Sequence, residues 1–382
     1  MSENTYSKVK IDSKYNINSF IEFIKKECVL IISLLLAIGS CFIATPKLSY
    51  IDFKVLILLF NLMIVVAAFN ELNVLDSIAV SLLKKCKSYT SISIALVFMT
   101  FVSAMIVTND VALLTFVPLS IIVSKKANLD ILKVVIFQTL AANLGSSFTP
   151  MGNPQNLFMY SFYNLLPSDF FKITAPILIL SVVLLLLLII KDKKLNLNMN
   201  LDKVEIGNKN HIIIFSILFI IILLSVFHII DYKFTFLLTV IVVMIINNKL
   251  FNKIDYSLLI TFIGFFIFVG NISTLNAVKI FMENMLHSGK STFISSVISS
   301  QIISNVPATM LLSGFTNHFK ELILGVNIGG MGTLIASLAS VISYKIYSNE
   351  FKDSGSKYLK VFIFYNVLGL LVMIPFIYFF II

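Results

Sequence analysis

A polar, amide-rich pattern occurs twice in a chain that is otherwise apolar enough to dissolve in a lipid bilayer. The first copy has Thr108-Asn109-Asp110 followed by a stretch rich in glycine and amides over 142–156. The second has Ser304-Asn305-Val306 followed by a similar stretch over 326–333. Irregular backbone at membrane depth is tolerated only where protein or a water-filled cavity covers it. A twofold occurrence is typical of membrane proteins built from two structural repeats.

The composition predicts an all-α, polytopic membrane protein. Of the 382 residues, 58% are hydrophobic and only 13% are charged, which lies outside the usual range of soluble domains. Several stretches with few or no charges approach the roughly 20 residues that a helix needs to cross a bilayer. We expect about nine full spans, at 28–46, 55–70, 134–166, 173–190, 210–230, 234–248, 256–278, 322–344 and 361–382.

The lysines indicate the orientation of the chain. All 29 basic residues are lysines, in short clusters between apolar runs. Cytoplasmic loops carry an excess of such residues. Most of the lysines lie on one side of the membrane if the segments 88–124 and 291–319 each enter and leave it on the same face. The sequence therefore predicts two re-entrant hairpins, a cytoplasmic N-terminus and an external C-terminus. The net charge of +10 then reflects topology and not a nucleic-acid partner.

In this arrangement the two hairpins enter from opposite faces, so the two halves of the chain are inverted copies. Each half has a span, a hairpin, a broken helix and a further span. The expected parts are a cytoplasmic N-terminal segment at 1–27, a first half at 28–190 (hairpin 88–124, broken helix 134–166), a cytoplasmic linker at 191–210, and a second half at 211–382 (hairpin 291–319, broken helix 322–344).

The broken helices are the expected binding elements. Pro150 and Pro154 interrupt the first one, and glycines interrupt the second. A break leaves free N–H groups on one side and free C=O groups on the other, so it can hold an anion and a cation. The expected substrate-binding side chains are Thr108, Asn109, Asn143, Ser146, Thr149, Asn153, Ser304, Asn305, Asn327 and Thr333. The expected ion-coupling glycines are Gly145, Gly152, Gly329 and Gly330. The structural alternative is that these residues only cap half-helices and join helices to one another.

Asp110 is the only charged residue between Ser88 and Ser124. A carboxylate inside a membrane is costly, so a functional role is the first interpretation. Asp110 could bind Na⁺, together with Asn109 and Asn305, or it could titrate and carry a proton. The structural alternative is an N-cap for the helix that follows it.

Motifs for other chemistry are absent from the sequence. The three cysteines, Cys28, Cys41 and Cys86, have no metal-ligand or redox spacing, and the four histidines form no constellation. Neither a Walker loop nor an HExxH helix is present. An intramembrane enzyme or a sensor would need a nucleophile or paired acids that the sequence does not offer. We therefore expect no catalytic activity and no cofactor, with an ion gradient as the energy source.

The same segments resemble the repeat signatures of the ion-transporter superfamily. This group holds citrate-transporter-like proteins, arsenite-pump permeases, divalent-anion/sodium symporters and a Na⁺/H⁺ antiporter branch. The resemblance covers nearly the whole chain. It is carried by Thr108-Asn109-Asp110-Val111-Ala112-Leu113-Leu114, Thr149-Pro150-Met151-Gly152-Asn153-Pro154-Gln155-Asn156 and Ser304-Asn305-Val306-Pro307-Ala308.

In the symporter branch, Ser-Asn-Thr tripeptides at the hairpin tips help bind sodium and substrate carboxylates. The resemblance implies these roles for Thr108, Asn109, Ser304 and Asn305. The third tripeptide position departs from that pattern, being an aspartate in one copy and a valine in the other, and this disfavours a dianion as substrate. Relatives also imply a rigid scaffold, a moving transport domain and often a homodimer.

The sequence thus favours a secondary active transporter of the plasma membrane. The preferred hypothesis is an anion permease that moves a small-molecule or inorganic anion with a Na⁺ or H⁺ gradient. Two alternatives stay open, a Na⁺/H⁺ antiporter that uses Asp110 and an arsenite-type efflux permease.

Overall fold

The computed structural model describes residues 27–127, 129–190 and 203–382. Most of the predicted N-terminal segment and of the predicted linker lies outside these residues. Within the described ranges every regular element is a helix, which confirms the all-α class. The helices that are long and apolar enough to cross a membrane are α3 (Phe53–Glu71), α5 (Tyr89–Val107), α9 (Pro167–Ile190), α10 (Lys209–Val226) and α18 (Gly355–Phe380).

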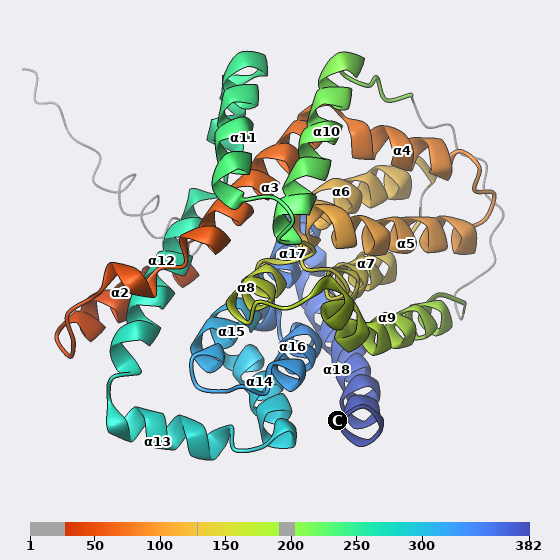
Figure 1. Ribbon diagram of the computed structural model, residues 1–382. Helices are drawn as coiled ribbons and strands as arrows, with labels where there is room; N and C mark the ends of the chain where they lie inside the picture. The colour runs from red at the N-terminus through yellow and green to blue at the C-terminus, as the bar shows by residue number, and fades with distance from the viewer. Residues whose placement is uncertain (1–26, 128, 191–202) are drawn as a thin grey trace, which may run out of the picture. The chain divides into compact units, whose positions relative to one another are not determined.

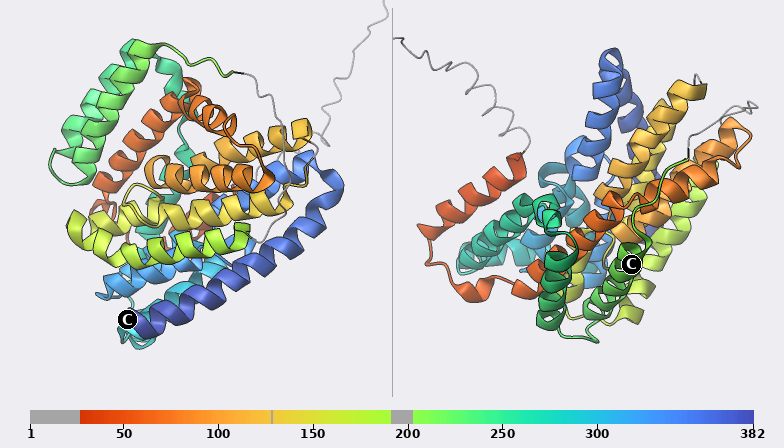
Figure 2. Two further views of the ribbon diagram at one scale, coloured as in Figure 1. Left: turned by 90° about the vertical axis from the view of Figure 1, so that its right-hand side faces the viewer. Right: turned by 90° about the horizontal axis from the view of Figure 1, so that it is seen from above.

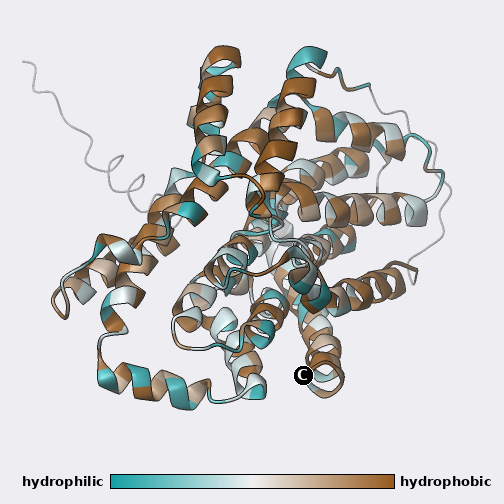
Figure 3. Ribbon diagram, viewed as in Figure 1, coloured by the Kyte–Doolittle hydropathy of each residue, from teal (hydrophilic) through white to brown (hydrophobic). Residues whose placement is uncertain are grey.

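These helices support a polytopic membrane protein, as expected, although they are fewer than the predicted spans. Counting the bent pair α12 (Tyr256–Ile272) and α13 (Asn276–Met285) as one span gives up to 6 among the described residues. Shorter apolar helices account for part of the difference. On the side that Figure 3 displays, α10 and α11 (Tyr232–Ile246) are largely apolar, as expected for helices in a membrane.

The described residues fall into two compact units. One unit contains α2 (Cys28–Cys41), the short helix η1 (Leu48–Tyr50) and α12. Helices α2 and α12 pack closely at Gly264. A Cβ atom added there would lie only 2.9 Å from the Ser33 hydroxyl oxygen. The buried Asn271 amide donates a hydrogen bond to Ser40, at 3.0 Å.

The predicted span at 256–278 is not one continuous helix. Helix α12 ends at Ile272, and α13 begins at Asn276 after a break at which Leu275 is extended. Helix α13 carries the exposed pair Lys279 and Glu283, with 3.9 Å between the charged atoms. Hydropathy alone missed this break, because the residues across it remain uncharged.

The other unit contains all the remaining elements (Figures 1 and 2). In the first half of the sequence these are α3, α4 (Val74–Leu83), α5, α6 (Asn109–Ala127), α7 (Leu132–Ser146), α8 (Pro154–Phe162) and α9. In the second half they are α10, α11, η2 (Asn248–Lys253), α13, α14 (Gly289–Ile303), α15 (Asn305–Ser313), α16 (Phe319–Gly329), η3 (Leu334–Ala336), α17 (Leu338–Glu350), η4 (Lys352–Ser354) and α18.

The segment 88–124 forms a pair of adjacent helices, α5 and α6, which run side by side in both figures. Ser88 starts α5 with a capping box, in which Ser88 and Ser91 each accept a hydrogen bond from the backbone N–H of the other. Thr108 alone joins the two helices, with φ of 83°. The Tyr89 hydroxyl donates to the Asp130 carbonyl at 3.0 Å, so the chain returns to the start of α5 after leaving α6.

The second hairpin repeats this local geometry. Ser288 and Ser291 form the same capping box at the start of α14. Ser304 alone joins α14 to α15, with φ of 74°. Positive φ is uncommon outside glycine, so the matching joints at Thr108 and Ser304 mark a common backbone design in the two halves.

Both predicted helix breaks are present. Helix α7 ends at Ser146 and α8 begins at Pro154, after Asn153 has capped it by accepting from the Asn156 N–H at 2.9 Å. In the second half, α16 ends at Gly329 and α17 begins only at Leu338. The proline, asparagine and glycine signals therefore located the breaks correctly.

Candidate functional site

Each hairpin tip docks onto the helix break of its own half. In the first half the Asn109 N–H donates to the Gly152 carbonyl at 3.1 Å. In the second half the Ser304 hydroxyl donates to the Ala336 carbonyl at 3.4 Å. When Asn143 is aligned with Asn327, the same spacing places Gly152 opposite Ala336, so the two tips contact equivalent carbonyl groups.

A second pair of equivalent contacts supports each tip from the side. The Thr149 hydroxyl donates to the Met105 carbonyl, and the Thr333 hydroxyl donates to the Gln301 carbonyl at 3.2 Å. Thr149 is half-buried, whereas Thr333 is exposed. These threonines hold a hairpin against a break, a role that the sequence did not predict for them.

The two breaks are joined to each other by reciprocal hydrogen bonds. The Asn153 amide nitrogen donates to the Asn327 amide oxygen at 3.1 Å. Ser337 is the second-half equivalent of Asn153, and its hydroxyl donates to the Asn143 amide oxygen at 2.9 Å. Asn143 and Asn327 thus each contact the residue at the N-cap position of a helix in the opposite half.

The reciprocity extends one helical turn further. The Asn327 amide nitrogen donates to the Asn156 amide oxygen at 2.7 Å. In the other direction, the Asn143 amide nitrogen donates to the Ser340 hydroxyl at 3.3 Å. Asn327 and Asn143 therefore use both their donor and their acceptor groups across the junction. The structure places the two breaks in one continuous, uncharged polar network.

The first hairpin tip joins this network. The Asn109 amide nitrogen lies 3.5 Å from the Asn143 amide oxygen. The Asn143 amide nitrogen also reaches the Gly330 carbonyl at 3.3 Å, and Asn153 donates to the Ser146 hydroxyl at 3.1 Å. Hydrogen bonds therefore connect five of the predicted substrate-binding residues to one another or to an intervening backbone group.

The second tip reaches the network through a glycine. Asn305 is buried, and a Cβ atom on Gly330 would lie 3.0 Å from its amide nitrogen. A Cβ atom on Gly152 would lie 2.2 Å from the Ser146 carbonyl oxygen, and one on Gly145 would lie 2.2 Å from the Phe101 carbonyl oxygen. The glycines thus permit close backbone approach around the breaks. Their predicted ion-coupling role stays a prediction.

Asp110 lies half-buried in the first turn of α6, next to Asn109. Its backbone N–H donates to the Asn109 amide oxygen at 3.0 Å, which leaves the Asn109 amide nitrogen to face Asn143. A carboxylate in the first turn of a helix is stabilised by the free N–H groups there. Asp110 therefore directly follows Asn109, the residue of the first hairpin tip that joins the uncharged network.

Three residues of the site were missed from the sequence: Gln301, Ser337 and Ser340. Gln301 donates to the Gly329 and Met331 carbonyls, at 2.6 and 2.8 Å, and accepts from the Thr333 N–H at 3.0 Å. It therefore satisfies backbone groups that the second break leaves free. Ser337 could have been found from the sequence, because it follows Asn327 by the same number of residues as Asn153 follows Asn143.

Four helices begin at this network. Asn109 and Asn305 are the first residues of α6 and α15, Asn153 caps α8, and Ser337 occupies the N-cap position of α17. Helix N-termini carry partial positive charge and free N–H groups, which attract anions. In the described ranges, no group of three or more His, Cys, Asp or Glu residues is placed to hold a metal ion. Chemically, the arrangement suits the recognition of an anion by dipoles and amides.

Comparison with known proteins gives an independent result. The profile of the citrate transporter family matches residues 22–317. An uncharacterized transporter of Methanocaldococcus jannaschii is 33% identical over 299 residues, which cover 78% of this chain and 81% of that protein. The inner membrane protein YbiR of Escherichia coli is 25% identical over 325 residues, covering 83% of this chain and 87% of that protein. A putative transporter, arsB, of Dictyostelium discoideum is 31% identical over 136 residues, covering 36% of this chain and 24% of that protein.

Proposed function

This chain belongs to the citrate transporter family, and we propose that it is a secondary active anion transporter driven by a gradient of Na⁺ or H⁺. Transport as the general function rests on the family and on relatives that are named transporters. The substrate that we propose is a small organic or inorganic anion. It binds where the two hairpin tips meet the two helix breaks, in a plasma-membrane protein that assembles as a homodimer.

The observation that carries the proposal is the meeting of four helix N-termini in one buried amide network. All basic residues of the chain are lysines, so no guanidinium is available to grip an anion. Backbone N–H groups, amides and hydroxyls at helix N-termini supply the attraction instead. An uncharged site also releases its substrate readily, because no buried ion pair must be broken.

We further propose that the two halves have opposite orientations in the membrane, with each hairpin entering from a different face. The matching joints at Thr108 and Ser304 support a common design for the hairpins. The reciprocal contacts of Asn143 and Asn327 support a pseudo-twofold axis through the site. The positions of the lysines support opposite orientations.

Asp110 is the residue that we propose for ion coupling. Its carboxyl adjoins Asn109 at the first hairpin tip, where it can bind Na⁺ or carry a proton. The same carboxyl favours a second candidate function, Na⁺/H⁺ antiport, in which Na⁺ and H⁺ compete for Asp110. Arsenite-type efflux is a third candidate, supported by the likeness to the putative transporter arsB.

Purified protein in proteoliposomes tests these candidates. Currents are measured on a solid-supported membrane while a panel of carboxylates, arsenite and inorganic anions is applied, with and without Na⁺ or pH gradients. We expect anion-dependent currents that a gradient increases, and we expect Asp110→Asn to abolish the gradient dependence. Asp169→Asn, at an exposed acid in the first turn of α9, is the control. Gradient dependence that survives in Asp110→Asn would refute the coupling role.

A further inference from the structure

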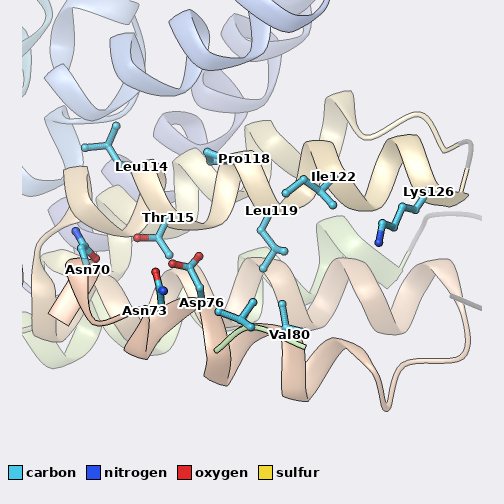
Figure 4. Close-up of a pocket in the computed structure, with 11 residues that line it drawn as sticks. Asn70, Asn73, Asp76, Val80, Leu114, Thr115, Pro118, Leu119, Ile122 and Lys126 are labelled. Atoms are coloured by element: carbon cyan, nitrogen blue, oxygen red, sulfur yellow. The ribbon is translucent and has the colours of Figure 1, made fainter. Parts of the chain in front are cut away.

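A cavity of ≈ 460 Å³ lies between α4 and α6 (Figure 4). One wall is a row of α6 residues one helical turn apart, Leu114, Pro118 and Ile122. Asp110 precedes Leu114 by one turn on the same row. The opposite wall contributes polar side chains from the end of α3 and the start of α4. The cavity thus runs along the helix whose first turn holds the proposed coupling residue.

Oxygen-bearing side chains from two elements line one end of this cavity. Figure 4 shows the Asp76 carboxyl and the Asn73 amide pointing toward the part of α6 that carries Thr115, which lines the same cavity. The Asn73 amide nitrogen donates to the Glu205 carbonyl at 3.2 Å, and the Thr115 hydroxyl donates to the Val111 carbonyl at 3.0 Å. Because these hydrogen-bond donors are engaged elsewhere, the two side chains present lone pairs to the cavity.

The backbone of α6 is irregular beside this cavity. Pro118 lies inside α6 and has no N–H group, so the Leu114 carbonyl lacks its regular helical partner. Both residues line the cavity. Hard monovalent and divalent cations prefer carboxylate, carbonyl and hydroxyl oxygens of this kind.

Among the residues that the structure describes, none pairs with the Asp76 carboxyl. Burial is the sole cause that raises the pKa of the Asp76 carboxyl above its ordinary value, and a bound cation would lower that pKa again. Lys126 lines the other end of the cavity. The helical rise between Thr115 and Lys126 is about 16 Å, so these two residues lie toward opposite ends of the cavity.

We propose that this end of the cavity binds a sodium ion through the Asp76 carboxylate, the Asn73 amide oxygen and the Thr115 hydroxyl. An ion bound there would lie beside α6, next to the row of residues that begins with Asp110. We therefore assign to this cavity the entry of the coupling ion. That role in coupling rests on the proposed function, whereas the binding of Na⁺ does not.

The test uses the absence of tryptophan from the sequence. Ile122→Trp places a single indole on the cavity wall, and its fluorescence is recorded in detergent while NaCl replaces choline chloride at constant ionic strength. We expect a saturable, Na⁺-specific change. Adding Asp76→Asn should raise the half-saturating Na⁺ concentration at least about tenfold, because the charged ligand is lost, while Asp76→Glu retains the response.

Two control variants separate this site from the rest of the protein. Asp169→Asn and Glu283→Gln, at exposed acids outside both proposed sites, should each leave the response unchanged, and size-exclusion profiles show whether every variant is folded. A missing Na⁺ response, an Asp76→Asn response equal to that of the parent, or a response lost in either control variant would overturn the site. The assay needs neither substrate nor a gradient, so failed transport would leave this inference standing. Conversely, Na⁺-driven transport without the fluorescence response would refute this inference alone.

Discussion

At the scale of single residues, the candidate site depends on amides and on glycines that allow close approach. Asn143 and Asn327 each donate and accept across the junction, which a carboxylate or an ammonium group cannot do. A neutral amide also costs less to bury than a charge when its hydrogen bonds are satisfied. Asparagine therefore connects the two breaks without placing charge in the site.

Gly152→Ala should damage this junction. Its Cβ atom would lie 2.2 Å from the Ser146 carbonyl oxygen, so the backbone of the break must move. We expect a loss of roughly 1–3 kcal/mol, as in other overpacked sites, together with loss of transport. Gly39→Ala is the matched control, because nothing lies within 4 Å of its added Cβ atom. Thermal stability, followed by size-exclusion chromatography of heated samples, distinguishes the two variants. Equal stability of both would contradict the close approach.

At the scale of elements, the sequence predicted the breaks and the hairpin tips because their signals are local. Proline, glycine and asparagine disfavour a continuous helix wherever they occur together, so the breaks after Ser146 and Gly329 could be located. Gln301 and Ser340 could not be identified in this way, since serine and glutamine are common in helices. Their importance arises only from partners that are distant in sequence.

The end of α12 at Ile272 was mislocated for a related reason. Hydropathy continues across Ser273 and Thr274, so no charge marks the break before α13. The predicted number of spans stays a prediction, because it counts shorter helices that do not by themselves reach the length needed to cross a membrane. Apolar length alone does not determine where a helix ends.

The base of the first hairpin gives a prediction at this scale. Tyr89→Phe removes the hydroxyl that donates to the Asp130 carbonyl and ties the start of α5 to the residues after α6. We expect a loss of about 1 kcal/mol, the net contribution of one such hydrogen bond, with transport retained. The same heated-sample assay applies. Tyr256→Phe, at a tyrosine that is 47% exposed, is the control, and an unchanged Tyr89→Phe melting point would argue against the contact.

At the scale of the whole molecule, the account rests on two halves of similar design that share one site. The capping boxes at Ser88 and Ser288, the left-handed joints and the tip-to-break contacts recur in both halves. Such recurrence is in keeping with a transporter family, since transporters commonly bind substrate between related halves. Opposite orientation of the halves remains the central proposal.

Single cysteines before the two capping serines test that proposal most directly. Lys87 and His287 are exposed and occupy equivalent positions. In a background with Cys28, Cys41 and Cys86 replaced by serine, each is changed to cysteine and treated with a membrane-impermeant maleimide. We predict that intact cells label the His287→Cys protein only, and that Lys87→Cys is labelled only after permeabilisation. Labelling of both positions from the same face would contradict the inverted arrangement.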